Sequence, residues 1–432
     1  MRITFIGTGY VGLVSGIMMS HLGHDVICID TDKDKIEKLN QQIMPIFEPE
    51  LLHYLKISAD NGSIKFQNYY DESLKKSDAI FITVGTPPLE SGEADLSFIM
   101  ETINNITNYT ISGLVIIKST VPPGTCAKIV KTLPKNSNIR IASNPEFLRE
   151  GNAVFDFLNP DRIIIGTNDK QSELVLHAIY QPLLDKNIPT VSANLETAEL
   201  IKYASNAFLA TKIAFINEIA DLSEKCGADI RKISLGVGLD SRIGEKFLKP
   251  GPGFGGSCFP KDICALSNYA KNSKSDFLVL DAVIKSNKER PANLVNKFAQ
   301  FFDNDFTGKC LAILGLAFKA GTDDIRSSPA IEIIKILLSK GANIIAYDPA
   351  AMENARKILQ EVKYADSALD ACINADAVII LTEWPEFKEL NFKDIYRQSK
   401  KPIIVDLRGI LPVTELIEQG FVCYTIGRKY EN

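Results

Sequence analysis

A βαβ unit at the start of the chain limits the folds that this sequence can adopt. Residues 3–7 have the pattern of a hydrophobic strand, Gly7, Gly9 and Gly12 form a GxGxxG turn before a helical pattern, and a second strand ends at Asp30. In this arrangement the first glycine permits a tight turn, the second lets the backbone approach a pyrophosphate, and the third permits close packing of the helix. The unit predicts a doubly wound α/β domain that binds a dinucleotide.

Asp30 indicates which dinucleotide is bound. An acid at the end of the second strand binds a ribose 2′-hydroxyl and repels a 2′-phosphate. A GxGxxG match alone is a weak signal, but here a strand, a helix and an acid frame it. The sequence therefore predicts NAD, rather than NADP, as the cofactor.

Three further strand patterns each end in a turn-rich segment. They cover residues 79–84, 115–120 and 140–143. Ligands of doubly wound sheets bind at the carboxyl ends of the strands, so Thr86, Thr120 and Glu146 are candidate ligand contacts. The alternative for the two threonines is a simple turn role.

The last third of the chain repeats this organisation. Residues 310–318 repeat the first strand and turn, 330–340 the helix, and 343–349 the second strand with its acid. The repeat predicts an α/β chain of two Rossmann-like doubly wound domains. The second copy lacks GxGxxG and has Lys319 in the corresponding loop, a position suited to an anion. We expect NAD in the first copy and a phosphorylated substrate in the second.

Residues 195–226 have a strongly apolar helical pattern that Gly227 can end. A helix of this length extends about 45 Å, enough to join two domains and to bury an apolar face against a partner chain. We therefore predict a homodimer with the two Rossmann-like domains joined by this long central helix. The predicted domains are 1–194 for NAD, 195–300 for the central helices, dimer interface and cysteine loop, and 301–432 for the substrate.

Cys258 lies in a glycine-rich loop, directly before a predicted helix. Pro260 suits the first turn of that helix, so the thiol would face unpaired N–H groups that favour a thiolate, and Lys261 adds a positive charge. The alternative is a small hydrophobic residue packed in a tight loop. Beside an NAD site, a thiolate can capture an aldehyde for a second oxidation, through a thiohemiacetal and then a thioester that water cleaves.

Candidates for the supporting groups occur at helical spacing. Lys202 and Asn206 are four residues apart on one face of the long helix, and Asp262 lies one turn after the cysteine. Glu146 and Glu150 are also four apart, which predicts a short helical turn that presents both acids. The alternatives are a solvated lysine for Lys202 and a capping or surface acid for Glu150.

Composition excludes several classes of partner. The formal net charge is −5 without long single-sign runs, which argues against nucleic acid or an anionic membrane as a partner. No apolar run approaches the roughly 18 residues of a membrane span, and the opening strand leaves no room for a secretory leader, so we expect a cytoplasmic protein. The eight cysteines are scattered, which predicts no bound metal.

Five segments together resemble the UDP-glucose/GDP-mannose dehydrogenase family, and the likeness runs through the whole chain in order. The GFGGSCFPKD segment is the most specific of them. The matching segments are residues 7–12, 118–125, 144–151, 253–262 and 315–329. The resemblance implies oxidation of UDP-glucose at C6 to UDP-glucuronate, with two NAD+ reduced in succession, and therefore a UDP-sugar as the substrate.

The resemblance also implies catalytic roles for single residues. The matching positions are Cys258 for the nucleophile, Lys202 and Asn206 for the pair that stabilises the oxyanion, Asp262 for the acid that supports them, Glu146 for thioester hydrolysis and Thr120 for a contact to active-site water.

Further positions match binding residues of the family. The candidate NAD contacts are Gly7, Gly9, Tyr10, Val11, Gly12, Asp30, Lys35, Thr86, Thr120, Glu150 and Arg326. The candidate substrate contacts are Glu146, Phe147, Leu148, Lys202, Asn206, Arg242, Phe247, Gly255, Lys319 and Arg408, with Arg242 reaching the neighbouring subunit's site.

Three alternatives remain open at this stage. GDP-mannose and N-acetylated UDP-sugar dehydrogenases share the fold and the cysteine chemistry. A hydroxyacid dehydrogenase that transfers two electrons would use Lys202 and leave Cys258 structural. A non-enzymic NAD-sensing or scaffold protein would use neither residue.

Overall fold

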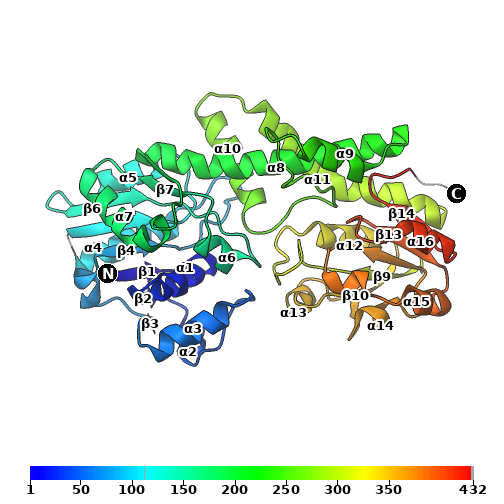
Figure 1. The fold of residues 1–432 in the computed structure, drawn as a ribbon, viewed down its shortest axis with the longest axis horizontal. Coiled ribbons are helices and arrows are strands. Elements are labelled where there is room, and N and C mark those ends of the chain that lie inside the picture. Colours follow the sequence, from blue (N-terminus) through cyan, green and yellow to red (C-terminus); the bar gives the residue numbers. More distant parts are fainter. Residues whose placement is uncertain (111, 430–432) are drawn as a thin grey trace. The chain divides into compact units, whose positions relative to one another are not determined.

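The computed structural model describes residues 1–110 and 112–429, which divide into two compact units (Figure 1). Unit 1 comprises Met1–Ser205 and Cys264–Lys274, and unit 2 comprises Asn206–Ile263 and the chain from Ser275 onward.

Unit 1 is built on an eight-stranded sheet with the order β3-β2-β1-β4-β5-β6-β7-β8. All neighbouring strands are parallel except β6 and β7. The strands are β1 Arg2–Ile6, β2 Asp25–Ile29, β3 Ile64–Gln67, β4 Ala79–Ile82, β5 Ser112–Ile117, β6 Asn138–Ser143, β7 Ile163–Gly166 and β8 Thr190–Ala193. The helices are α1 Tyr10–His21, α2 Lys33–Asn40, α3 Leu51–Asp60, the 3₁₀ helix η1 Glu72–Lys76, α4 Ser97–Tyr109, α5 Thr125–Thr132, α6 Ala153–Leu158 and α7 Lys170–Leu184.

Helices cover both faces of this sheet, as a doubly wound sheet requires (Figure 1). On one face α1, α3, α6 and α7 bury a cluster that includes Phe5 and Phe81, whose rings stack 4.8 Å apart. On the other face α4 and α5 bury an isoleucine-rich cluster that includes Ile82 and Ile117. The alternation follows from the two-residue period of each strand.

Unit 2 contains a six-stranded parallel sheet with the order β11-β10-β9-β12-β13-β14. The strands are β9 Cys310–Leu314, β10 Asn343–Tyr347, β11 Lys363–Tyr364, β12 Ala377–Ile380, β13 Ile403–Asp406 and β14 Val422–Thr425. The helices around it are α12 Pro329–Ser339, α13 Met352–Arg356, α14 Ala368–Cys372, the 3₁₀ helix η3 Pro385–Lys388, α15 Phe392–Gln398 and α16 Val413–Glu418. Counted along the chain, this order is the same as that of the first six strands of unit 1, so the predicted repeat and fold class are confirmed.

Four α-helices lie between the two sheets in the sequence. They are α8 Leu195–Cys226, α9 Ile230–Gly238, α10 Phe259–Asn272 and α11 Leu278–Phe298, followed by the 3₁₀ helix η2 Ala299–Phe302. Helix α8 has the predicted bounds, and Gly227 after it adopts a φ of 75°, a left-handed conformation that ends helices. Both α8 and α10 contribute residues to each unit.

Candidate active site

The GxGxxG turn has two glycines fixed by packing and one that faces open space. A Cβ on Gly7, which has a φ of 96°, would lie 2.9 Å from the backbone of Thr83, and a Cβ on Gly12 would lie 1.9 Å from the carbonyl oxygen of Gly7. A Cβ on Gly9 would meet no atom within 4 Å. Gly9 is also the N-cap residue of α1. The turn therefore leaves room for a pyrophosphate at the helix N-terminus, and these residues fit NAD.

Asp30 follows β2 and is held by the turn that it faces. Its Oδ2 accepts hydrogen bonds from the N–H and the hydroxyl of Thr8, both at 2.7 Å, and from Lys35 Nζ at 3.0 Å. Its Oδ1 accepts from the N–H of Asp32 at 3.0 Å. Burial alone would raise the pKa of Asp30, but these donors outweigh it and lower the pKa. The structure thus brings two predicted NAD contacts, Asp30 and Lys35, together as an ionised pair.

Tyr10 is held by an acid that sequence reasoning missed. The hydroxyl of Tyr10 donates to Glu48 Oε2, which also accepts from the N–H of Gly151 at 2.7 Å, while Oε1 accepts from the N–H of Ala153 at 2.7 Å. Burial and the nearby Glu48 raise the pKa of Tyr10. Glu48 therefore joins the start of α1 to the turn that contains the buried Glu150. It lies in a loop without a motif, so nothing in the sequence marks it.

The loops after β4 and β5 meet through two predicted residues. The Thr86 hydroxyl donates to the carbonyl oxygen of Thr120 at 3.0 Å. Strand β5 ends at Ile117, before its predicted end at residue 120, because the N–H groups of Lys118 and Ser119 both donate to Ile82. Val11 lies half-buried on the first turn of α1.

The helical turn predicted for Glu146 and Glu150 is wrong. Residues 144–149 form no helix, because Asn144 continues to pair after β6: its N–H donates to Ile117 at 2.9 Å and its side-chain amide to Ile164 at 2.8 Å. Instead Glu146 Oε2 accepts from the N–H of Leu148 at 2.6 Å, which closes a tight turn. The two acids therefore do not share a helix face.

Glu146 and Lys202 form a buried ion pair. Lys202 Nζ lies 3.0 Å from Glu146 Oε1, and the side chains are only 5% and 4% exposed. Burial alone would raise the pKa of Glu146, but Lys202, the Leu148 N–H and Lys118 lower it, so the carboxylate is ionised. Lys202 also lies 5.2 Å from the ring centroid of Phe147. The solvated alternative for Lys202 is therefore excluded.

Lys118, which directly follows β5, is a second buried lysine near this pair. Its Nζ donates to Asn144 Oδ1 at 3.0 Å and to the Tyr180 hydroxyl at 3.3 Å. Burial lowers the pKa of Lys118 to about 8. The nearby Glu146 carboxylate opposes this shift, and the positive charge of Lys202 adds to it. The place of Lys118 in the predicted strand of residues 115–120 gave no indication that its side chain is buried beside Glu146 and Lys202.

In unit 2, Cys258 directly precedes α10, as predicted. The N–H of Asp262 donates to the carbonyl oxygen of Cys258 at 3.0 Å, which forms the first helical turn, and Cys258 Sγ lies 3.5 Å from Ser257 Oγ. Asp262 is 1% exposed; its Oδ2 accepts from Asn206 Nδ2 at 2.6 Å, and its Oδ1 from Lys261 Nζ at 2.5 Å. Asp262 thus fixes the Asn206 amide and balances the charge of Lys261.

The glycine loop before Cys258 packs tightly on the second sheet's first loop. A Cβ on Gly255 would lie 2.3 Å from the carbonyl oxygen of Ser327 and 3.1 Å from Phe318, and a Cβ on Gly256 would lie 2.8 Å from the Phe318 ring. Arg408 Nη2 donates to the carbonyl oxygen of Phe318 at 2.7 Å. The neighbouring Lys319 Nζ lies 5.4 Å from the centroid of the same ring. Three predicted substrate contacts, Gly255, Lys319 and Arg408, are therefore gathered around Phe318.

The other predicted residues of unit 2 lie in separate local settings. Arg242 is 87% exposed in its side chain and binds Asp240 through its guanidinium. Phe247 adopts a φ of 66°, a left-handed conformation, and its ring lies 6.1 Å from that of Phe259.

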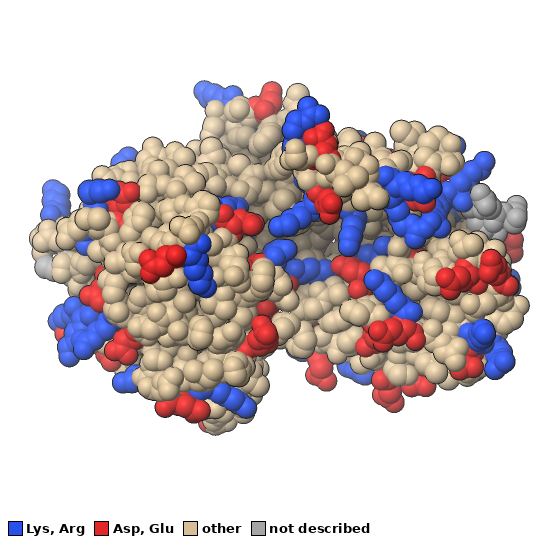
Figure 2. Space-filling view, viewed as in Figure 1, with Lys and Arg blue, Asp and Glu red and all other residues tan. Residues whose placement is uncertain are grey.

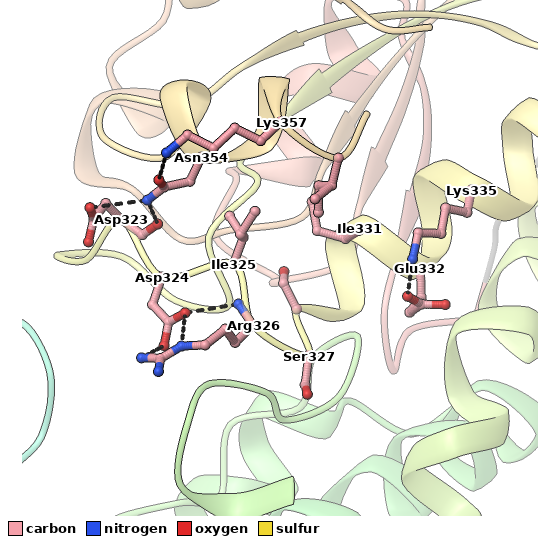
Figure 3. Close-up of a pocket in the computed structure, with 12 residues that line it drawn as sticks. Asp323, Asp324, Ile325, Arg326, Ser327, Ile331, Glu332, Lys335, Asn354 and Lys357 are labelled. Atoms are coloured by element: carbon pink, nitrogen blue, oxygen red, sulfur yellow. Dashed lines mark hydrogen bonds and ion pairs between the residues drawn. The ribbon is translucent and has the colours of Figure 1, made fainter. Parts of the chain in front are cut away.

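Arg326 lines a cavity of about 560 Å³ at the N-terminus of α12 (Figure 3). Its guanidinium pairs with Asp324, with Nε and Nη2 each 2.8 Å from a carboxylate oxygen. Other polar side chains of the cavity also bind one another; for example, Lys335 donates a hydrogen bond to Glu332. Arg326 is the one predicted site residue that lines this cavity.

The second copy of the strand-ending acid, Asp348, has a structural role. It is fully buried, and its Oδ2 accepts from the N–H groups of Leu316 and Ala317 and from Trp384 Nε1, while Oδ1 accepts from the N–H groups of two following residues. Five donors within unit 2 thus occupy the carboxylate of Asp348, which is the counterpart of Asp30 in unit 1.

Neither a metal-binding cluster nor a membrane-spanning helix occurs among the described residues. Across 1–110 and 112–429 no group of three or more His, Cys, Asp or Glu side chains is arranged to hold a metal ion. In the same residues no helix is long and apolar enough to cross a membrane. Acidic and basic side chains are interspersed over the visible face (Figure 2).

Three family models match the chain in succession. They describe the NAD binding domain, the central domain and the UDP binding domain of the UDP-glucose/GDP-mannose dehydrogenase family, at residues 1–184, 196–289 and 312–413. Together with the site, they define an NAD-dependent oxidoreductase. The chain belongs to the UDP-glucose/GDP-mannose dehydrogenase family.

Individual relatives are similar over nearly their full length. A UDP-glucose 6-dehydrogenase of Rickettsia bellii is 56% identical over 99% of this chain and 100% of its own. A UDP-glucose dehydrogenase structure from Pyrobaculum islandicum has a TM-score of 0.89 at 36% identity, covering 95% of this chain and 94% of its own. A UDP-D-ManNAc dehydrogenase structure from Pyrococcus horikoshii has a TM-score of 0.87 at 30% identity and covers 100% of both chains.

Proposed function

We propose that this protein oxidises UDP-glucose at C6 to UDP-glucuronate in two NAD-dependent steps, with Cys258 as the covalent carrier. The observation that carries the proposal is the position of Cys258 directly before α10, with Asp262 bonded to Asn206 one turn further on. The identity to the Rickettsia bellii UDP-glucose 6-dehydrogenase supports UDP-glucose as the substrate.

In the proposed reaction, NAD held by the GxGxxG turn and Asp30 would supply the hydride acceptor for both oxidations at C6. In the first oxidation the C6 hydroxyl also gives up its proton, to solvent. Lys202 and Asn206 stabilise the oxygen of C6 as charge develops on it. The Cys258 thiolate adds to the aldehyde carbon, and the C6 oxygen takes up a proton to form a thiohemiacetal. Loss of the second hydride and of that proton leaves a thioester on the sulfur.

Glu146 directs water in the last step. Its ionised carboxylate accepts a proton from water as the oxygen adds to the thioester carbon, and the Cys258 thiolate leaves. Thr120 is proposed to position this water. The products are the C6 carboxylate, the regenerated thiolate and two protons, of which Glu146 takes one from the water and the new carboxylic acid releases the other.

The binding roles are assigned residue by residue. We assign NAD to the GxGxxG turn with Asp30, Lys35, Thr86 and Glu150, together with Arg326. The UDP-sugar is assigned to Phe147, Leu148, Gly255, Lys319 and Arg408, with Phe247 and Arg242 as further contacts. The boundaries 1–194, 195–300 and 301–432 remain our proposed domains.

A homodimer is also part of the proposal. On α8 the large apolar side chains of Phe208, Phe215 and Leu222 are 66%, 53% and 57% exposed, and their seven-residue spacing places them on one helix face. Burial of this face by a second copy would remove it from water. Light scattering tests this, with a dimeric wild type and a monomeric Phe215→Glu expected. A monomeric wild type would contradict the homodimer, and a dimeric Phe215→Glu would contradict this helix face as its interface.

We further propose a cytoplasmic location, where eight reduced thiols persist. Cell fractionation tests this location.

Stoichiometry tests the reaction. Purified protein is given limiting UDP-glucose with excess NAD, and we expect two NADH and one UDP-glucuronate per sugar. One NADH with a released carbonyl product would indicate a two-electron dehydrogenase instead. GDP-mannose and UDP-D-ManNAc serve as competing substrates, since a structure related at 30% identity is named for the latter; preference for either would replace UDP-glucose.

A further inference from the structure

Arg162 is brought beside the Glu146 turn by the one reversal of strand direction in the first sheet. Strands β6 and β7 are antiparallel with Ser143 opposite Gly166. Counting four residues forward from Ser143 and four back from Gly166 places Phe147 opposite Arg162. The bond from the Asn144 amide to Ile164 lies in the same extension of the two strands. The start of β7 thus lies at the edge where the parallel strands end.

The guanidinium of Arg162 stacks on the ring of Phe147. Its Cζ lies 3.5 Å from the ring centroid, well within the range of a cation–π interaction. Lys202 Nζ lies 5.2 Å from the same centroid and 3.0 Å from Glu146 Oε1. One ring therefore contacts two cations, of which Lys202 also forms an ion pair.

The contact with Phe147 dominates the surroundings of Arg162. Within residues 1–110 and 112–429, the guanidinium forms no hydrogen bond and no ion pair within 4.0 Å. Burial lowers the pKa of Arg162, and the carboxylates of Asp161 and Glu146 oppose this effect from a distance. A half-buried arginine without a bonded acid is held by its stacking, not by a salt bridge.

We propose that Arg162 is a positioning residue that acts through Phe147. By stacking on the ring it fixes the tight turn of residues 146–148, and so sets the Glu146 carboxylate against Lys202 and presents Phe147 and Leu148 to the sugar. The inference rests on the proposed function, because its readout is the oxidation of UDP-glucose. It assigns a sugar-side role to a residue outside the family's matching motif segments.

A double-mutant cycle tests this directly. The variants are Arg162→Met, Phe147→Leu and their combination, with Arg140→Met as the control, since Arg140 is a partly exposed arginine of β6 whose nearest acid is Asp169. We expect Arg162→Met to lower kcat/KM for UDP-glucose roughly tenfold, as for loss of a desolvated cation–π contact, and to leave KM for NAD unchanged. In the double variant, kcat/KM for UDP-glucose should fall no further than it does in Phe147→Leu alone. The control should retain wild-type kinetics.

Each contrary result has a defined meaning. Independent, multiplying losses in the double variant would show that Arg162 acts other than through Phe147, and wild-type kinetics in Arg162→Met would remove its role. Arg162→Met could instead lower the melting temperature and raise KM for NAD by the same factor by which it lowers kcat/KM for UDP-glucose. That result would make Arg162 a purely structural residue. If Arg162→Met does not fold, the cycle is repeated with Arg162→Lys. The wild type's own NADH yield decides the proposed function separately.

Discussion

Lys202 Nζ lies 3.0 Å from Glu146 Oε1, and almost no surface of either side chain reaches solvent. Removing one member of such a pair leaves an uncompensated buried charge, which costs about 3–5 kcal/mol. We therefore expect Glu146→Gln to destabilise the protein by about this amount, measured by urea unfolding at pH 7. The combined Glu146→Gln, Lys202→Met variant should regain much of the stability but no activity. A single variant as stable as the wild type would contradict the buried pair.

Acid stability should depend on the same carboxylate. Because the pKa of Glu146 is lowered in the folded protein, its ionisation stabilises the fold above the ordinary pKa range of a glutamate. This stabilisation is lost as the pH falls through the folded-state pKa. We expect urea midpoints measured from pH 7 to pH 3 to fall less steeply in Glu146→Gln than in the wild type. If the urea midpoints of the two proteins fall equally with pH, the pKa of Glu146 is the same in the folded and the unfolded protein.

Lys118 predicts a second rise of stability with pH, this time in the alkaline range. Its folded pKa of about 8 lies below that of an exposed lysine, so between these values the unfolded chain binds more protons than the folded one. Stability should therefore rise with pH, by up to about 3 kcal/mol between pH 8 and pH 10.5. Lys118→Met should abolish the rise, whereas Lys135→Met, at an exposed position, should keep it.

Cys258 should be required for net oxidation but not for folding. Cys258→Ala removes the atom that holds the aldehyde, so we expect no UDP-glucuronate, with an unchanged melting temperature. Cys226→Ala, which removes an exposed thiol, is the control and should retain full activity. Two NADH per sugar from Cys258→Ala would overturn the covalent route.

The two strand-ending acids should respond differently to the same change. Asp30→Ala removes a charge-assisted acceptor and should weaken NAD binding by about 1.5–3 kcal/mol, measured by titration calorimetry. Asp348→Ala should leave NAD affinity unchanged and lower the melting temperature, because five donors lose their acceptor. If Asp30→Ala and Asp348→Ala weaken NAD binding equally, the assignment of Asp30 to the NAD site is wrong.

The close approach of Gly255 to Ser327 predicts a steric effect. Gly255→Ala places a Cβ 2.3 Å from a carbonyl oxygen, and overpacking of this kind costs about 1–3 kcal/mol. Gly236→Ala is the matched control, because its Cβ would meet no atom within 4 Å. Thermal melting distinguishes the two, and equal melting temperatures would show that the loop is not tightly packed.

Local patterns predicted much of this molecule, since a turn, a cap or a helix face depends on neighbours in sequence. The GxGxxG turn, the bounds of α8 and the position of Cys258 before α10 are of this kind. The helical turn at Glu146 failed because Asn144 keeps pairing with strands distant in sequence. Glu48 and Arg162 escaped prediction for the same reason: a loop between α2 and α3 and the reversal of β7 bring them to the site, and neither leaves a local signal.

The burial of Asp348 has a consequence for the order of events in the proposed reaction. We assign NAD only to the turn beside Asp30, so on this proposal the two hydride acceptors would bind at the same turn in succession. The spent cofactor has to depart and a fresh one enter while the half-oxidised sugar waits. In the proposed route, a covalent bond to Cys258 would keep that reactive intermediate from escaping during the exchange.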